Sequence, residues 1–195
     1  MKADDFLRLC EHPDEHSGSA FLDAVQRLDD ASVQRVLAVH SQAGTHPLSC
    51  LIGGALGASV AGEDTEGWIH AVEAALERGF PLQLSTSHGF RDAGHEVLDV
   101  LESLSASLAD DLEGEALDPV AAREAGRLLD VFLARGWSPY EDVPMTLSQN
   151  EPRSVSQRIQ AEGNPELETW LAEHEAALID QGLPLSHEGL PPPRL

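Results

Sequence analysis

Apolar residues recur at helical spacing in four stretches of the chain, and each stretch ends at a glycine. Before Gly79, the residues Ile69, Val72 and Leu76 lie three or four positions apart and would share one helix face. Similar stripes are Val33, Val36 and Leu37; Ala125, Leu128, Leu129, Phe132 and Leu133; and Leu167, Trp170, Leu171 and Leu178. The patterns predict four helices, which end at Gly44, Gly79, Gly136 and Gly182.

Three of these glycines lie in a recurring phrase: an apolar pair, two polar or small residues, glycine, a large apolar residue and a nearby proline. It reads ALERGFPL at 75–82, FLARGWSP at 132–139 and ALIDQGLPL at 177–185. Glycine takes the left-handed conformation that ends many helices, and proline stops a helix from continuing. Two of the predicted helices also begin with a common signal: Asp118-Pro119 and Asn164-Pro165 each combine a capping side chain with a first-turn proline. The phrase is therefore interpreted as a helix-termination signal.

A second helical segment precedes each of these helices, so the chain reads as four helix-turn-helix pairs. The second segments span about 19–28, 46–59, 92–112 and 152–162. One pair cannot bury its apolar face alone, so three or more pairs must stack. We expect an all-α fold with one repeat domain over 1–182, in which 1–18 form an N-terminal cap segment. The proline-rich residues 183–195 are expected to form a loosely ordered tail.

The ends and starts of these helices resemble those of ankyrin repeats. ALERGF resembles the end of that family's outer helix, and Gly89 follows Gly79 by ten residues, as the family's turn glycine does. THPLSCLIGGAL at 45–56 resembles the opening of the inner helix. The resemblance covers about 19–186, with extra residues between the helices of two units. It implies a loose α-solenoid of helical hairpins with one exposed concave face, suited to binding another protein.

Charge narrows the range of partners. The chain has 195 residues, 34 of them acidic and 12 basic, and a formal net charge of −22. This charge argues against binding to nucleic acid or to an anionic membrane, because phosphate groups would be repelled. Two interpretations stay open: a solvated surface that keeps the protein soluble, and a surface matched to a basic protein partner.

Acidic residues gather in two inserted segments, 58–67 and 108–119, and beside an aromatic residue after Gly136. The residues expected to contact a basic partner are Glu63, Asp64, Glu66, Asp110, Asp111, Glu113, Glu115, Tyr140, Glu141 and Asp142. Exposed aromatic side chains flanked by acids are typical of binding hot spots. Trp137 aligns with Phe80 in the repeated phrase, so we expect it to pack against the next pair. For Tyr140 two possibilities stay open: an exposed position in a binding surface, and a position packed against a neighbouring helix pair.

Patterns for catalysis or metal binding are weak. His12 and His16 have the spacing of two ligands on one helix face, but Pro13 lies between them and no third ligand is evident. The glycine-rich residues 53–62 match no phosphate-binding motif. They resemble faintly the opening helix of ADP-ribosyl-glycohydrolases, without that family's acidic metal motifs. A helix whose small residues allow close packing is the simpler interpretation. We expect no catalytic residue, metal or other cofactor.

The cysteines and the N-terminus favour a cytoplasmic protein. Cys10 and Cys50 have no paired spacing, which is typical of reduced, half-buried thiols. The N-terminus lacks the apolar run of a signal peptide, and no stretch approaches the roughly 20 apolar residues of a membrane span. Arginine rather than lysine supplies almost all of the positive charge, which is compatible with a GC-rich bacterial genome.

These patterns predict a non-enzymatic protein-interaction module. In its most concrete form it is an acidic, immunity-type inhibitor that neutralises a basic bacterial toxin, such as a nuclease. One alternative is an ankyrin-like adaptor without inhibitory activity. Another is a hydrolase, ADP-ribosyl-glycohydrolase-like or otherwise metal-dependent, that uses histidines and carboxylates around residues 53–62. A deep pocket that contains His70, His88 or His95 would favour this alternative. A toxin gene beside this one would favour the inhibitor, and a bound divalent metal would favour the hydrolase.

Overall fold

The computed structural model describes residues 1–109, 119–141 and 154–180, and these ranges are mostly helical. The helices are α1 (Ala3–Glu11), α2 (Gly18–Gln26), α3 (Asp30–Ala43), α4 (Ser49–Val60), α5 (Glu66–Glu77), α6 (Ala93–Ala109), α7 (Pro119–Leu133), α8 (Val155–Glu162) and α9 (Pro165–Asp180). A 3-10 helix, η1 (Pro13–Glu15), and two strands, β1 (Gln83–Thr86) and β2 (Gly89–Asp92), complete the described elements. The expected all-α class is confirmed apart from this small sheet. The expected tail at 183–195 lies outside the described residues.

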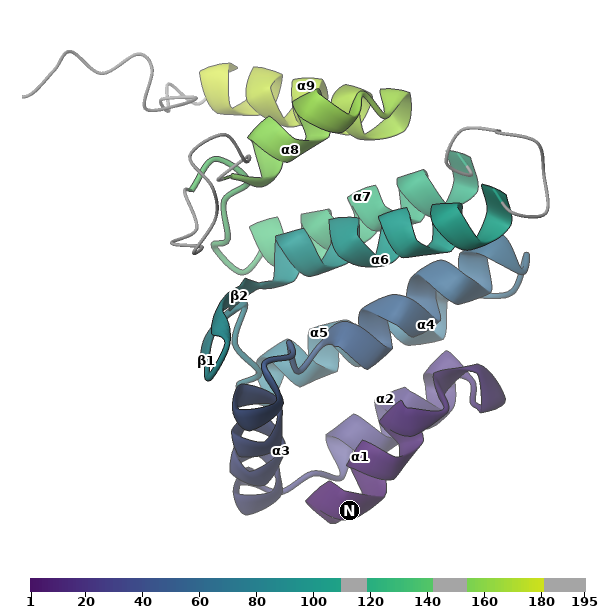
Figure 1. Cartoon of the computed structure of the whole chain (residues 1–195), viewed down its shortest axis with the longest axis vertical. Helices are drawn as coiled ribbons and strands as arrows, with labels where there is room; N and C mark the ends of the chain where they lie inside the picture. Colours follow the sequence, from purple (N-terminus) through teal and green to yellow (C-terminus); the bar gives the residue numbers. More distant parts are fainter. Residues whose placement is uncertain (110–118, 142–153, 181–195) are drawn as a thin grey trace, which may run out of the picture.

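Three helix pairs lie one above another in Figure 1: α4 with α5, α6 with α7, and α8 with α9. Neighbouring pairs touch through α4 with α6 and α7, and through α7 with α9. The second helical segments expected near 46–59, 92–112 and 152–162 correspond to α4, α6 and α8. Buried apolar side chains form a continuous cluster that extends from Phe6 in α1 to Leu171 in α9.

The first expected pair departs from this arrangement. α2 packs along α5, while α3 runs steeply across the others and contacts α1 and β1 (Figure 1). Two glycines explain the α2–α5 contact, because a Cβ added at Gly18 would overlap the Trp68 backbone, and one at Gly67 would lie 2.7 Å from the Ser19 nitrogen. The ring of Phe21 then lies 4.8 Å from that of Trp68, centroid to centroid. Close backbone approach thus replaces the expected α2–α3 hairpin.

The glycines that the sequence assigns to helix ends adopt the expected backbone conformation. Gly44, Gly79 and Gly136 have φ angles of 74°, 90° and 86°, and Gly182 lies outside the described residues. The first two phrases also have the same hydrogen-bond pattern. The Phe80 N–H donates to the Ala75 carbonyl at 3.0 Å, and the Trp137 N–H donates to the Phe132 carbonyl at 3.1 Å. The interpretation of the phrase as a termination signal is confirmed at these two sites.

The hairpin formed by β1 and β2 is absent from the sequence-based expectation. Its strands are antiparallel, with Gln83 opposite Asp92 and Thr86 opposite Gly89. The tip is fixed to the C-terminal turn of α3, because the Ser87 N–H donates to the Ser41 carbonyl at 2.9 Å. Four-residue strands with mostly polar side chains carry little period-two signal, so this hairpin is difficult to recognise from sequence.

Polar contacts attach the later helices. Arg158 of α8 has a side chain that is only 15% exposed, and it forms ion pairs with Asp99 and Glu102 of α6 at 2.5 and 3.1 Å. The indole N–H of Trp137 donates to the buried carboxylate of Asp92 at 3.0 Å. Trp137 is buried, as expected, but it packs against Gly94 at the start of α6 and against Phe132 of α7, which belong to its own helix pair and not to the next one.

Candidate functional site

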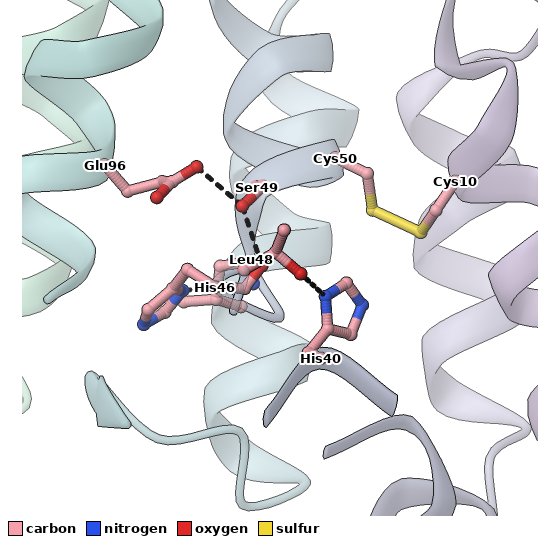
Figure 2. The surroundings of a disulfide bond; sticks show 8 residues. Cys10, His40, His46, Leu48, Ser49, Cys50 and Glu96 are labelled. Carbon is pink, nitrogen blue, oxygen red and sulfur yellow. Dashed lines mark hydrogen bonds between the residues drawn. A yellow bond between two sulfur atoms is a disulfide. The ribbon is translucent and has the colours of Figure 1, made fainter. Parts of the chain in front are cut away.

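One corner of the fold brings together residue types used in hydrolases: His46, Ser49 and Glu96 (Figure 2). The Ser49 hydroxyl lies 2.6 Å from Glu96 Oε1 and 2.7 Å from the backbone oxygen of His46. The His46 ring, in contrast, makes no contact with that hydroxyl. Its Nδ1 accepts the Leu48 N–H at 3.2 Å, and its Nε2 lies 3.3 Å from the Leu82 carbonyl, to which it can only donate.

The His46 ring is neutral and its two nitrogens are engaged with backbone groups. Burial lowers the pKa of His46 to about 4, so the ring stays neutral at pH 7 with both nitrogens engaged. Burial also raises the pKa of Glu96, and the hydrogen bond from Ser49 partly offsets this rise. Neither ring nitrogen of His46 is available to take the Ser49 proton. The corner therefore joins α4 to α6 and to the segment before β1, and it is a structural element of the fold.

The other histidines have separate structural environments. His40 Nδ1 lies 2.8 Å from Thr45 Oγ1, as expected for a packed histidine on an apolar face. His88 lies against Gly44, where an added Cβ would overlap its ring. His12 is exposed and His16 is half-buried. Across 1–109, 119–141 and 154–180, no group of three His, Cys, Asp or Glu residues could hold a metal ion.

The glycine-rich residues 53–62 belong mainly to α4 and its C-terminal turn. Gly54 lies under the Trp68 ring, where a Cβ would overlap the ring carbons. Gly53 and Gly57 have open space where a side chain would be. At Gly54 the simpler interpretation, a small residue that permits close helix packing, is confirmed.

The expectation of two separate, reduced cysteines is wrong for this structure. Cys10 of α1 and Cys50 of α4 are joined by a disulfide, with their Cα atoms 5.3 Å apart (Figure 2). Sequence spacing gave no sign of the pairing, because 40 residues separate them and the contact arises only when α1 folds back onto α4. The bond attaches the N-terminal helix to the first of the three stacked pairs.

The proposed acidic residues that the structure describes lie at two places rather than in one cluster. Glu63, Asp64 and Glu66 are exposed at the turn between α4 and α5. Glu141 is exposed and follows α7, whose C-terminal end lies at the opposite end of the helix pairs from the α4–α5 turn (Figure 1). The remaining proposed acids, Asp110, Asp111, Glu113, Glu115 and Asp142, lie outside the described residues. Glu66 is also engaged within the chain, because its Oε2 lies 2.7 Å from Arg127 Nη2.

Most arginines of the described residues are engaged in contacts within the chain. Ion pairs hold Arg27 to Asp23, Arg127 to Glu66 and Glu124, Arg135 to Glu77, and Arg158 to Asp99, Glu102 and Glu162. Arg78, Arg91 and Arg123 donate to the backbone carbonyls of Gln26, Gly44 and Pro119. Because these contacts use the scarce arginines, the remaining surface is dominated by carboxylates.

Tyr140 packs against α9. Its ring is nearly parallel to that of His174, with centroids 6.2 Å apart, and His174 is stacked in the same way on Trp170 at 5.8 Å. Burial and the nearby Glu175 carboxylate raise the pKa of the Tyr140 hydroxyl, whose oxygen is buried although the residue as a whole is half-buried. Tyr140 is thus one end of a three-ring column, and Trp170 is the other.

A cavity of about 490 Å³ lies between α7 and α9, beside the last ring of this column. Its lining consists of Ala122, Arg123, Gly126, Arg127, Asp130, Pro165, Glu166, Thr169, Trp170 and Glu173. We call this space the α7–α9 groove. Sequence reasoning missed it, because Trp170 was assigned only to an apolar stripe. The signal present in the sequence was a large aromatic residue with Glu166 and Glu173 close to it on the same helix.

Comparison with known proteins adds no relative. No protein-family model, curated protein or solved structure matches the chain. The resemblance to ankyrin repeats therefore depends on the residues alone. In the part of the chain that the structure describes, no helix is both long and apolar enough to cross a membrane.

Proposed function

We propose that this protein is a non-enzymatic interaction module that binds a basic protein partner. The observation that carries the proposal is the engagement of the arginines within the fold. A net charge of −22 combined with internally paired arginines leaves carboxylates to face solvent, and such a surface attracts and orients a basic partner.

The architecture supports the same proposal. The α4–α5, α6–α7 and α8–α9 pairs have the succession expected of a loose, ankyrin-like solenoid. The β1–β2 hairpin connects α5 to α6, and its second strand begins at Gly89, the turn glycine on which the ankyrin resemblance depends. Solenoids of this kind bind proteins along extended surfaces, which fits a chain in which His46 and Ser49 are engaged in structural contacts.

In its most specific form, the proposal is an immunity-type inhibitor that covers the active site of a basic bacterial toxin in the cytoplasm. Exposed carboxylates at the α4–α5 turn, Glu63 and Asp64, would contact basic residues of the toxin. Glu66 would act indirectly, because its ion pair with Arg127 holds the turn against α7. An adaptor that binds a basic protein without inhibiting it would use the same surface.

Co-expression with the product of the neighbouring open reading frame tests the inhibitor. Growth rescue together with a purified complex would establish inhibition. A complex without rescue would establish the adaptor instead. Recovery of only acidic or membrane-bound partners from the source cell would overturn the proposal of a basic partner.

Salt and charge variants test the electrostatic part. Binding should weaken steeply between about 0.15 M and 1 M salt, where the screening length falls from about 8 to 3 Å. The double variant Glu63→Gln, Asp64→Asn should reduce the association rate more than Asp4→Asn, Asp5→Asn. Both pairs are exposed and both variants remove two charges, but the second lies on α1. Equal effects would assign the steering to total charge and remove the α4–α5 turn from the binding surface.

A further inference from the structure

The α7–α9 groove combines an oriented aromatic ring with carboxylates in a space of about 490 Å³. We propose that this groove receives an arginine side chain of the basic partner, with the guanidinium stacked on Trp170. The inference rests on the proposed function and adds to it a defined site and a defined side chain. This site lies on α7 and α9, at the Trp170 end of the ring column whose other end is Tyr140.

Trp170 is held in place before any ligand binds. Its indole N–H donates to Asp130 Oδ1 at 2.8 Å, which anchors α9 to α7. His174 stacks on it with an interplanar angle of 9°. On α7 the ring meets Gly126, where an added Cβ would lie 3.2 Å from Trp170 Cδ1. A ring fixed by three contacts loses little conformational freedom on binding, which favours recognition by stacking.

The charges around the ring match a cation. Three carboxylates line the groove, those of Asp130, Glu166 and Glu173. Of the two lining arginines, Arg127 is already paired with Glu66 at 2.7 Å and Glu124 at 3.1 Å. Arg123 donates its Nε–H to a backbone carbonyl of its own helix. Carboxylates therefore exceed the positive charge that is not already paired.

Arginine fits this arrangement better than lysine. A guanidinium is planar, so it can stack on an indole while its edge donates to carboxylates. The cavity volume lies within the range of ligand pockets, roughly 300–1,000 Å³, and accommodates a long side chain with part of its backbone. Through the Arg127–Glu66 ion pair the groove also adjoins the acidic α4–α5 turn. A basic segment in the groove would therefore lie close to the surface that the charge pattern already indicated.

Short peptides with blocked ends test the site without knowledge of the partner. One contains arginine and glycine, the second replaces arginine with lysine, and the third replaces it with glutamate. The readout is the indole N–H signal of Trp170 in NMR spectra, assigned by loss of the signal in Trp170→Phe. The arginine peptide should shift the Trp170 signal and leave those of buried Trp68 and Trp137 unchanged. The lysine peptide should bind more weakly.

Matched variants give the decisive comparison. Glu173→Gln should weaken arginine-peptide binding about three- to tenfold, because a charged acceptor forms the stronger hydrogen bond. Glu168→Gln removes the same charge from an exposed site of α9 outside the groove lining, and should change affinity less than about twofold. Trp170→Leu should cost about two- to thirtyfold in affinity. If Trp170→Leu does not fold, the two surface variants still decide the question.

The outcomes separate this inference from the proposed function. Equal losses in Glu173→Gln and Glu168→Gln would show a non-specific charge effect and overturn the groove. Preferential binding of the glutamate peptide would make the groove an anion site, through Arg123, and would also overturn it. Capture of basic proteins with no peptide response at Trp170 would leave the proposed function standing and reject the groove alone. Failure to bind any basic protein or peptide would reject both.

Discussion

Trp68 and Trp170 each lie against a glycine of a neighbouring helix, yet their surroundings differ. Trp68 is 4% exposed, lies over Gly54 of α4 and touches the ring of Phe21. Trp170 is half-buried, lies beside Gly126 of α7 and donates to Asp130. Similar pairs of residue types thus give a closed apolar contact near the N-terminus and an open, polar one near the C-terminus.

The difference extends to the two halves of the molecule. The N-terminal helices are held by aromatic packing, including Phe6 against Phe21 and Phe80, and by the disulfide. The later helices share the apolar core, and Arg158 with its carboxylates and hydrogen bonds from indole groups add polar contacts to it. Apolar closure stabilises a helix contact, whereas a contact completed by polar groups leaves side chains that a ligand can also reach. The C-terminal half is therefore the better place for recognition.

Reduction of the disulfide should cause the largest loss of stability, and only the N-terminal half should respond structurally. Closing a loop across a sequence separation of 40 residues restricts the unfolded chain by about 4 kcal/mol in the chain-entropy description. Denaturant unfolding with and without reductant should show this loss, and Cys10→Ala with Cys50→Ala should match the reduced protein.

Arginine-peptide binding at Trp170 serves as the control and should persist after reduction. An unfolding midpoint that does not respond to reductant would show that the bond contributes nothing. The same measurement bears on location, because cytosolic reductants open most disulfides. Retention of the bond in protein isolated under thiol-trapping conditions would count against a cytoplasmic location.

Acidification should destabilise the corner around His46. Its folded pKa, about 4, lies below the ordinary value of 6.5, so the unfolded state binds more protons between these pH values. Stability is therefore lost as the pH falls from 6.5 toward 4, by about 3 kcal/mol in full. Glu96 opposes this trend, because burial raises its pKa and the folded state takes up its proton earlier.

The matched variant is His46→Gln, whose amide can still donate to the Leu82 carbonyl. Its free energy of unfolding should fall less steeply over this pH range than that of the natural protein, because the variant lacks the buried imidazole. Some loss is expected in both proteins, because their carboxylates titrate in the same way. Parallel pH profiles would mean that His46 does not control acid stability. Histidine NMR titration gives an independent check, because the His46 ring should remain neutral at pH 6.

Sequence periodicity predicted helices well and contacts between them poorly. Gly79 and Gly136 end helices as expected, because a left-handed glycine is a local requirement. The α2–α5 contact, the disulfide and the α7–α9 groove depend on residues far apart in the chain, which local patterns do not encode. Glu66 shows the same limit for the candidate site: its acidity was evident, but its partner, Arg127, is 61 residues away.

The smallest effects are expected from Gly54→Ala and Gly126→Ala, which each add one methyl group. These two variants compare the Trp68 contact directly with the Trp170 contact. In Gly54→Ala the new Cβ would overlap the Trp68 ring. Overpacking should cost about 1–3 kcal/mol, partly offset by the roughly 1 kcal/mol that alanine gains over glycine in a helix. In Gly126→Ala the Cβ lies 3.2 Å from a half-buried ring that can shift outward. The unfolding free energy should therefore change by less than about 1 kcal/mol.

Binding should show the opposite order. A shift of Trp170 would alter the surface on which the guanidinium stacks, so Gly126→Ala should weaken the arginine peptide severalfold while Gly54→Ala leaves its affinity unchanged. Unfolding curves and peptide titrations on the same two proteins measure both effects. If Gly126→Ala instead destabilises the fold as much as Gly54→Ala, then Trp170 is closed into the core as firmly as Trp68. The distinction between a closed N-terminal contact and an open C-terminal site would then be wrong.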